Sequence, residues 1–203
     1  MNARREPITV ALLAAPAVTG ATLYGVYDAL ASVRRDWAML HGGGEVESPF
    51  RPLVVSRDGT AVEGANGVRL VAQASFAECP APQVACITDL ALPPHEPPGD
   101  GYAAEVAWLR QCHANGALVA SSCSGAVLLA QTGLLDEEEA TSHWAYCDVL
   151  ARRHPRTRWH PERGLVHAGR DGRILMSGSG IAWHMLALAL ISRFAGPEAA
   201  LQV

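Results

Sequence analysis

The stretch Ala117-Leu-Val-Ala-Ser-Ser-Cys123-Ser-Gly-Ala-Val-Leu-Leu-Ala130 decides the fold of this 203-residue chain. An apolar run of strand length leads into a turn of small and polar residues, and an apolar run of helical character follows at once. This order predicts a sharp strand-to-helix turn that presents Cys123 at the carboxyl end of a sheet. Ligand crevices of open α/β sheets form at that end, so we expect function to centre on Cys123.

The rest of the chain alternates between candidate strands and candidate helices. Strands are predicted at 8–15, 53–55, 68–71, 84–90, 117–122, 164–168 and 173–176, and helices at 22–33, 103–113, 124–131, 143–153 and 181–194. The first strand is apolar throughout, as is typical of a strand buried on both faces. The alternation predicts βαβ units, a mainly parallel sheet and helices on both of its faces, in one domain that spans residues 1–203.

Composition restricts the classes of function. The formal net charge is -4 and the hydrophobic fraction is 49%, which are values of an ordinary globular domain. All 16 cationic side chains are Arg, and their scatter gives no basic footprint for nucleic acid. A chain without Lys also excludes a Schiff-base mechanism. No apolar run reaches the ~20 residues of a membrane span and no signal peptide is recognisable, so we expect no membrane contact and a cytoplasmic location.

The chain has five cysteines with no CxxC pair among them: Cys79, Cys86, Cys112, Cys123 and Cys147. We interpret four of them as buried free thiols and Cys123 as the reactive or ligand-facing one. The helix that starts behind Cys123 points free N–H groups at the sulfur, which predicts a lowered thiol pKa. The amide of Ser124 is placed to donate to a developing oxyanion, and Gly125 keeps the turn free of a bulky neighbour.

One segment resembles a known family. The order Cys123-Ser-Gly-Ala-Val-Leu-Leu-Ala-Gln-Thr-Gly-Leu-Leu-Asp136, followed by Ala140-Thr-Ser-His-Trp144, is similar to class I glutamine amidotransferase-like domains of the DJ-1/PfpI superfamily. That branch includes the N-terminal domains of AraC-type transcriptional regulators and the isonitrile hydratases. The resemblance implies a flavodoxin-like three-layer α/β sandwich, commonly a homodimer, with Cys123 and His143 as the matched functional residues.

The chain departs from the pattern of the family's hydratases. The acid that would lie beside the sulfur falls on Thr22, and a second acid falls on Asp28. A threonine can hydrogen-bond a thiol but cannot hold a proton as a carboxylate does. The Pro-Gly-Gly loop that gives relatives a second oxyanion amide is replaced by Leu92-Pro-Pro94, and proline has no N–H. We therefore expect a pocket with an incomplete catalytic set, lined from residues 92–101 and 144–148.

His143 allows two interpretations. It is the general base for Cys123 if the two lie within hydrogen-bond reach, or it caps the helix that begins beside it. The other seven histidines have no metal-ligand spacing, so we expect no metal, and no motif indicates a cofactor. The arginines at 152–158 are better explained by a solvated face around Pro155 than by DNA contact.

Three functions remain open. The first is a ligand-sensing, regulatory domain of an AraC-type transcriptional regulator, with an unknown small-molecule ligand near Cys123. Residues 191–203 resemble the stretch that leads into the helix-turn-helix domain of such regulators, so we expect contact with DNA only through a separate domain outside this chain. The second is a stand-alone Cys-dependent hydratase or hydrolase in which His143 carries the proton. The third is a redox or stress protein that responds through Cys123.

Overall fold

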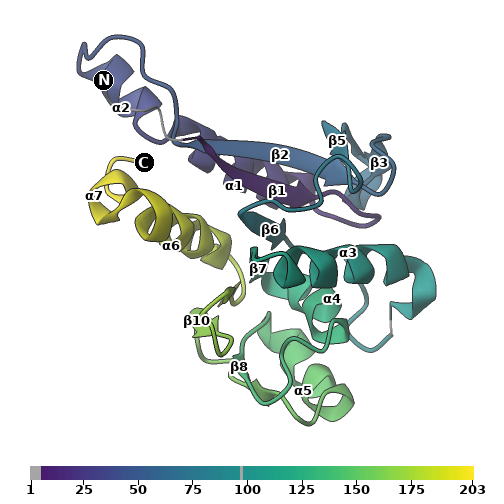
Figure 1. Cartoon of the computed structure of the whole chain (residues 1–203). Helices are drawn as coiled ribbons and strands as arrows, with labels where there is room; N and C mark the ends of the chain where they lie inside the picture. Colours follow the sequence, from purple (N-terminus) through teal and green to yellow (C-terminus); the bar gives the residue numbers. More distant parts are fainter. Residues whose placement is uncertain (1–5, 97) are drawn as a thin grey trace.

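The computed structural model describes residues 6–96 and 98–203, and a seven-stranded sheet forms its centre (Figure 1). The sheet order is β10-β11-β7-β6-β1-β2-β5. Neighbouring strands are parallel except for β10, which is antiparallel to β11. The strands are β1 (Ile8–Leu13), β2 (Phe50–Ser56), β5 (Ala74–Ser75), β6 (Val84–Ile87), β7 (Leu118–Ser122), β10 (Leu165–Ala168) and β11 (Ile174–Ser177).

Helices cover both faces of this sheet. From β1 the chain moves outward to β2, whereas from β6 it moves the other way to β7. Right-handed crossovers therefore place the first helix and the β6–β7 helix on opposite faces. The first helix and the last long helix also contact each other. The main helices are α1 (Gly20–Ser32), α3 (Ala103–Ala114), α4 (Ala126–Gln131), α5 (Trp144–Arg153) and α6 (Ala182–Ala195). The expected flavodoxin-like three-layer α/β sandwich is confirmed.

The smaller elements were not predicted from the sequence, or only in part. They are α2 (Arg35–Leu40), α7 (Pro197–Ala200), two short strand pairs, β3 (Val62–Glu63) with β4 (Arg69–Leu70) and β8 (Glu139–Ala140) with β9 (Arg158–Trp159), and the 3-10 turns η1 (Ala65–Gly67), η2 (Gly99–Tyr102) and η3 (Cys123–Gly125). Each of these elements contains only two to six residues, too few for a hydrophobic period to be recognised.

The core lies on both sides of the central strands. Residues Val10 to Leu13 of β1 and Val84 to Ile87 of β6 are fully buried, which explains why these strands are apolar without alternation. Among the described residues, no helix is both long enough and apolar enough to cross a membrane.

The strand order reverses between β1 and β6. The chain leaves β1 toward β2 on one side and later returns to β6 on the other side. In open α/β sheets, the crevice outside the carboxyl ends of the strands at such a reversal is the usual ligand site. The segments that follow β1, β6 and β7 contain Thr22, Asp89 and Cys123, so these three residues meet at that crevice.

Candidate functional site

Cys123 sits on the expected strand-to-helix turn. The residue before it, Ser122, is extended, whereas Cys123 has a φ of 54°, a conformation that non-glycine residues rarely adopt. A 3-10 turn, η3, then leads into α4. Strain of this kind persists only where the surroundings hold the backbone in place, and it is characteristic of functional turns. The predicted strand-to-helix turn at Cys123, called the elbow below, is thus present in the backbone.

Gly125 is required by close packing at the elbow. A Cβ added at this position would lie 2.5 Å from the carbonyl oxygen of Thr88 and 2.8 Å from that of Ile87. Both oxygens belong to the backbone at the end of β6, so neither can move away without disturbing the sheet. The glycine therefore brings the β7 elbow directly against the end of β6.

A cavity of about 240 Å³ opens beside Cys123. It is large enough for a small ligand. Its lining combines residues from α1, the β6 loop, β7, the start of α5 and the start of α6, namely Thr22, Asp89, Ser122, Cys123, His143, Gly180 and Trp183. Two residues expected at the site from sequence, Thr22 and His143, are therefore brought together with Cys123.

The protonation of Cys123 differs from the expectation. Burial raises the pKa of the thiol, the N–H of Ser124 lowers it, and the carboxylate of Asp89 raises it further. The net direction is upward, so the predicted lowering of the pKa by the helix N-terminus is wrong. One turn of 3-10 helix followed by the six-residue α4 offers only a short dipole, and desolvation of the sulfur outweighs it.

The other four cysteines are buried, as expected. Cys79, Cys86, Cys112 and Cys147 are each at most 6% exposed, and all five cysteines are free thiols. Burial raises the pKa of Cys86 and of Cys112 to about 12. Cys123 is the one cysteine with partial exposure, and all five lie in the described residues. Access, rather than a lowered pKa, distinguishes it from the rest.

The side chain of Ser124 fixes the neighbouring loop. Its Oγ accepts the N–H of Leu90 at 2.8 Å and donates to the Leu90 carbonyl at 2.7 Å. Its backbone N–H faces the sulfur of Cys123. Ser124 therefore combines the expected amide beside the thiol with a second role, which is to tie the segment after β6 to the elbow.

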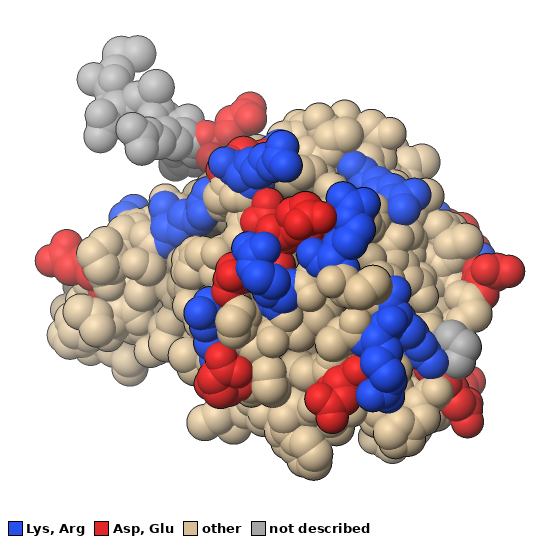
Figure 2. Space-filling model, turned by 90° about the horizontal axis from the view of Figure 1, so that it is seen from below, with Lys and Arg blue, Asp and Glu red and all other residues tan. Residues whose placement is uncertain are grey.

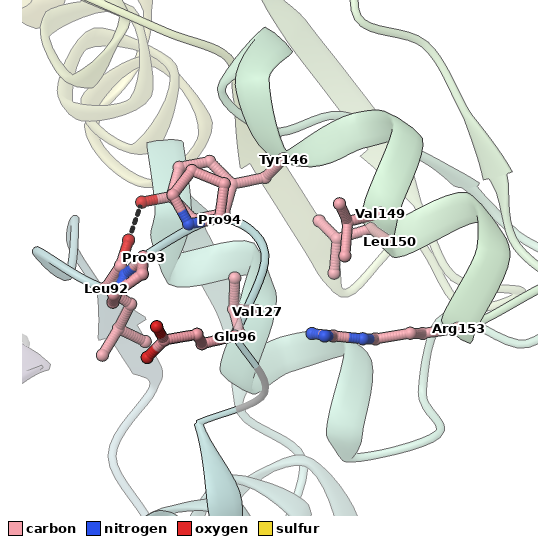
Figure 3. A pocket seen from close by; sticks show the side chains of 9 residues that line it. All are labelled: Leu92, Pro93, Pro94, Glu96, Val127, Tyr146, Val149, Leu150 and Arg153. Carbon is pink, nitrogen blue, oxygen red and sulfur yellow. Dashed lines mark hydrogen bonds between the residues drawn. The ribbon is translucent and has the colours of Figure 1, made fainter.

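The loop Leu92-Pro-Pro94 does not line the Cys123 cavity. It borders a separate hollow of about 10 Å³ against α4 and α5 (Figure 3), which holds about one water molecule. Tyr146 donates its hydroxyl to the Leu92 carbonyl across this hollow (Figure 3), and Arg153 donates to the carbonyl of His95 at 3.1 Å. No described residue from 92–101 or from 144–148 lines the Cys123 cavity, so the expected pocket wall is wrong for both segments.

This loop also offers no second oxyanion amide near its start. The N–H groups of Ala91 and Leu92 bond to the carbonyls of Ala17 and Leu90. Pro93 and Pro94 have no N–H to donate. With the Leu90 N–H on Ser124, the amides between 90 and 94 are all used or missing.

Thr22 contacts a carboxylate that the sequence did not single out. Its hydroxyl donates to Oδ1 of Asp89 and also approaches the carbonyl of Thr19 at 3.0 Å. Asp89 lies just beyond β6 and is partly buried. Asp28, the other acid considered from sequence, is exposed on α1 and is not among the residues that line the cavity. The acid at this site thus comes from the β6 loop.

His143 forms the N-cap of α5. Its Nδ1 accepts the backbone N–H of Ala145 at 3.1 Å, so the hydrogen of the neutral ring lies on Nε2. A ring in this tautomer has no free lone pair with which to take a proton from a thiol. In this geometry His143 can donate a hydrogen bond into the cavity, and the capping interpretation describes its observed contact.

Trp183 closes the cavity on the α6 side. Its ring packs on Gly25 of α1 so closely that an added Cβ there would lie 2.5 Å from Cη2. Ser122 also lines the cavity, and its hydroxyl is fully buried and has no hydrogen-bond partner within the described structure. The cavity therefore has an aromatic wall and, just beneath its surface, a polar group without a partner.

The arginines after α5 are neutralised by neighbouring acids. Arg156 pairs with Asp136 and Glu137, and Arg158 pairs with Glu139. Figure 2 shows positive and negative side chains interspersed on the face that it presents. This pattern fits a solvated surface. In the described part of the chain, no group of three or more His, Cys, Asp or Glu side chains could hold a metal ion.

A comparison with models of protein families gives a match over most of the chain. Residues 37–192 match the model of the DJ-1/PfpI family. The chain belongs to the DJ-1/PfpI family. This match includes Asp89, Cys123 and His143 but begins after Thr22.

Proteins similar to this chain include transcriptional regulators and an enzyme. The HTH-type transcriptional regulator CdhR of Pseudomonas aeruginosa is 36% identical over 98 residues, which are 48% of this chain and 28% of that protein. The isonitrile hydratase of Pseudomonas putida is 28% identical over 201 residues, covering 95% of this chain and 75% of the enzyme. The crystal structure of an AraC family transcriptional regulator from Pseudomonas putida has a TM-score of 0.74 at 24% identity and covers 96% of both chains. The resemblance found in the sequence is confirmed.

Sequence reasoning missed Asp89, Ser122, Gly180 and Trp183 as residues of this DJ-1/PfpI cavity. A signal for Asp89 existed, because it is a polar residue directly after a buried apolar strand, as Cys123 is. Ser122 had a signal as well, because it ends β7 directly before Cys123. Gly180 and Trp183 had no comparable signal, since their place depends on how α6 returns to the sheet.

Proposed function

We propose that this chain is a ligand-sensing, regulatory domain of an AraC-type transcriptional regulator and that a small molecule binds in the Cys123 cavity. The observation that carries the proposal is the use of His143 Nδ1 as a helix cap. It leaves the site without the imidazole base that a cysteine nucleophile needs. A cavity with an unused hydroxyl, a ring N–H and an aromatic wall is suited to holding a ligand without converting it.

Similarity to regulators supports the same proposal. The matched part spans 28% of CdhR, so DNA contact by a whole regulator would come from a domain that is not part of this chain. A cytoplasmic location follows from this role. A homodimer is part of the proposal as well, supported by exposed apolar side chains on two neighbouring helices, Tyr24 of α1 and Met185 and Leu188 of α6.

A ligand screen tests this proposal. Small polar metabolites are added one at a time, and the thermal midpoint of the purified chain is recorded. Compounds that raise the midpoint are then titrated by calorimetry against the wild type, Ser122→Ala and Trp183→Ala. We expect binding that weakens about tenfold or more in either variant, since each removes a contact from the cavity wall. Asp28→Asn serves as the matched surface control and leaves binding unchanged.

The alternative function is hydration of isonitriles, favoured by a similarity to isonitrile hydratase that covers 95% of this chain. The reaction would add water across the isonitrile carbon to give an N-substituted formamide. Incubation with an alkyl isonitrile, followed by NMR, detects that product directly. Formation of the formamide by the wild type and its loss in Cys123→Ala would replace the sensor proposal with an enzymatic one.

A further inference from the structure

Asp89 is held at the cavity from two sides. Its backbone carbonyl accepts the N–H of Thr19 at 3.1 Å, and its carboxylate accepts the hydroxyl of Thr22 one turn further along α1. The next residue, Leu90, is fixed at both its N–H and its carbonyl by Ser124 of the elbow. A side chain anchored between α1 and the elbow has little freedom to turn away. Its place beside Cys123 is built into the fold.

We propose that Asp89, positioned by Thr22 in the cavity that Cys123 also lines, is the acidic partner of Cys123, and that its carboxylate adds to burial in opposing ionisation of the thiol. The carboxylate reaches the cavity from the end of β6, whereas the chain has a threonine at the corresponding place on α1. This inference concerns the cavity of the proposed function, but its test requires no ligand. The inference about Asp89 and the proposed ligand-sensing function can therefore fail separately.

The charges around Cys123 favour this role. Asp89 from the β6 loop adds a negative charge, while α5 contributes His143 and the hydroxyl of Tyr146. The described lining residues from α1 and from the segment entering α6 are Thr22, Gly180 and Trp183, which do not carry charge. No Arg lies among the described lining residues to offset the carboxylate. A thiolate would therefore form beside a like charge in a partly desolvated cavity, where repulsion is stronger than in water.

The charges at this site also affect the neighbouring hydroxyl of Tyr146. Burial raises the pKa of Tyr146, and the negative charge of Asp89, joined by that of Cys123 whenever the thiol ionises, raises it further. The hydroxyl of Tyr146 thus stays protonated and keeps its hydrogen bond to Leu92. Asp89 is in this sense a positioning residue: it acts on ligands and reagents through the protonation state of Cys123.

The rate of alkylation as a function of pH tests the inference. The wild type, Asp89→Asn and Asp28→Asn are treated with iodoacetamide between pH 6 and pH 10, and peptide mapping quantifies the label on Cys123. We expect Asp89→Asn to move the rise in rate down by about one pH unit, which is a roughly tenfold gain in rate near pH 7. Asp28→Asn keeps the wild-type profile, because Asp28 is exposed on α1 outside the cavity. Circular dichroism verifies that each variant is folded.

Moving the carboxylate provides the stricter test. The double variant Thr22→Asp/Asp89→Asn transfers the acid from the β6 loop to α1, and we expect its profile to return to that of the wild type. Asp89→Ser is a second variant that removes the charge while keeping an oxygen for Thr22, and it must shift in the same direction as Asp89→Asn. A wild-type profile in folded Asp89→Asn or Asp89→Ser would overturn the inference, as would an unrestored profile in the double variant. None of these outcomes depends on whether a ligand is found.

Discussion

The ends of β6 and β7 lie side by side and place a polar side chain in the same cavity, yet they are built differently. The end of β7 is held by its backbone: Cys123 has a positive φ, and Gly125 presses against backbone carbonyls. The end of β6 is held by side chains, since Thr22 and Ser124 hydrogen-bond to Asp89 and Leu90. The thiol of Cys123 is therefore fixed by packing, whereas the carboxylate of Asp89 beside it is fixed by hydrogen bonds. Changes at the two ends should therefore have different consequences.

The largest effect on stability is expected at Gly125, where the ends of β6 and β7 touch. Gly125→Ala places a Cβ at 2.5 Å from the Thr88 carbonyl oxygen, so we expect a loss of about 3 kcal/mol or more in the free energy of unfolding. Urea denaturation measures it. Gly101→Ala is the matched control, because an added Cβ there meets nothing within 4 Å. Equal stability of the two variants would contradict the close contact between the strand ends.

A change at the hydrogen-bonded end of β6 should lower the free energy of unfolding by less. Ser124→Ala leaves the buried N–H of Leu90 without its acceptor, while the Leu90 carbonyl keeps the N–H of Leu92, and for the lost acceptor we expect a loss of about 2 kcal/mol. Hydrogen exchange should also show faster exchange of the Leu90 amide. Ser32→Ala on α1 removes one bond to the carbonyl of Ala29 and serves as the control. Unchanged exchange at Leu90 would show that the loop is held in another way.

Cys86, inside β6, is a fully buried thiol whose ionisation can be compared with that of Cys123 at the end of β7. Burial raises the pKa of Cys86 to about 12, while an unfolded chain ionises near about 8.5. The folded state then binds the proton more tightly, so its contribution to stability is complete below the unfolded value and is lost as pH rises toward 12. Between pH 8 and pH 10 we expect the wild type to lose about 2 kcal/mol more than Cys86→Val. Parallel alkaline loss in both proteins, measured by urea denaturation, would contradict this.

The smallest effect concerns His143, which borders the same cavity. His143→Ala removes the acceptor for the Ala145 N–H, and we expect a loss of about 1 kcal/mol in unfolding free energy. His143→Asn should restore most of it, because asparagine is a good N-cap. The thermal midpoints of the three proteins provide the comparison. If Asn gave no recovery, capping would not be the structural role of this residue.

The two strand ends also differ in how far the sequence predicts them. The elbow is local: an apolar strand, Cys123, small residues and an apolar helix stand within fourteen residues, so its geometry could be inferred. The contact between Thr22 and Asp89 joins residues 67 positions apart. Nothing in the spacing of either residue indicates the other. Only the sheet order, which places β1 next to β6, brings them together.

The same reasoning explains the remaining differences. The long strands and helices follow from apolar runs and turn residues, whereas α2 is too short, at six residues, to show a period. The thiol pKa was misjudged because the helix N-terminus is visible in the sequence, but the burial of the sulfur and the approach of Asp89 are not. His143 was correctly placed at a helix start, while the choice between cap and base needed the position of the Ala145 N–H.

We propose that Cys123 is a neutral, ligand-facing thiol and not an activated nucleophile. Ultraviolet difference absorbance near 240 nm between the wild type and Cys123→Ser, followed as pH rises, measures its ionisation directly. We predict that the thiolate signal of Cys123 appears only above about 8.5, the ordinary value of a cysteine. A thiolate signal already present at pH 7 would contradict the proposal that Cys123 is a neutral thiol.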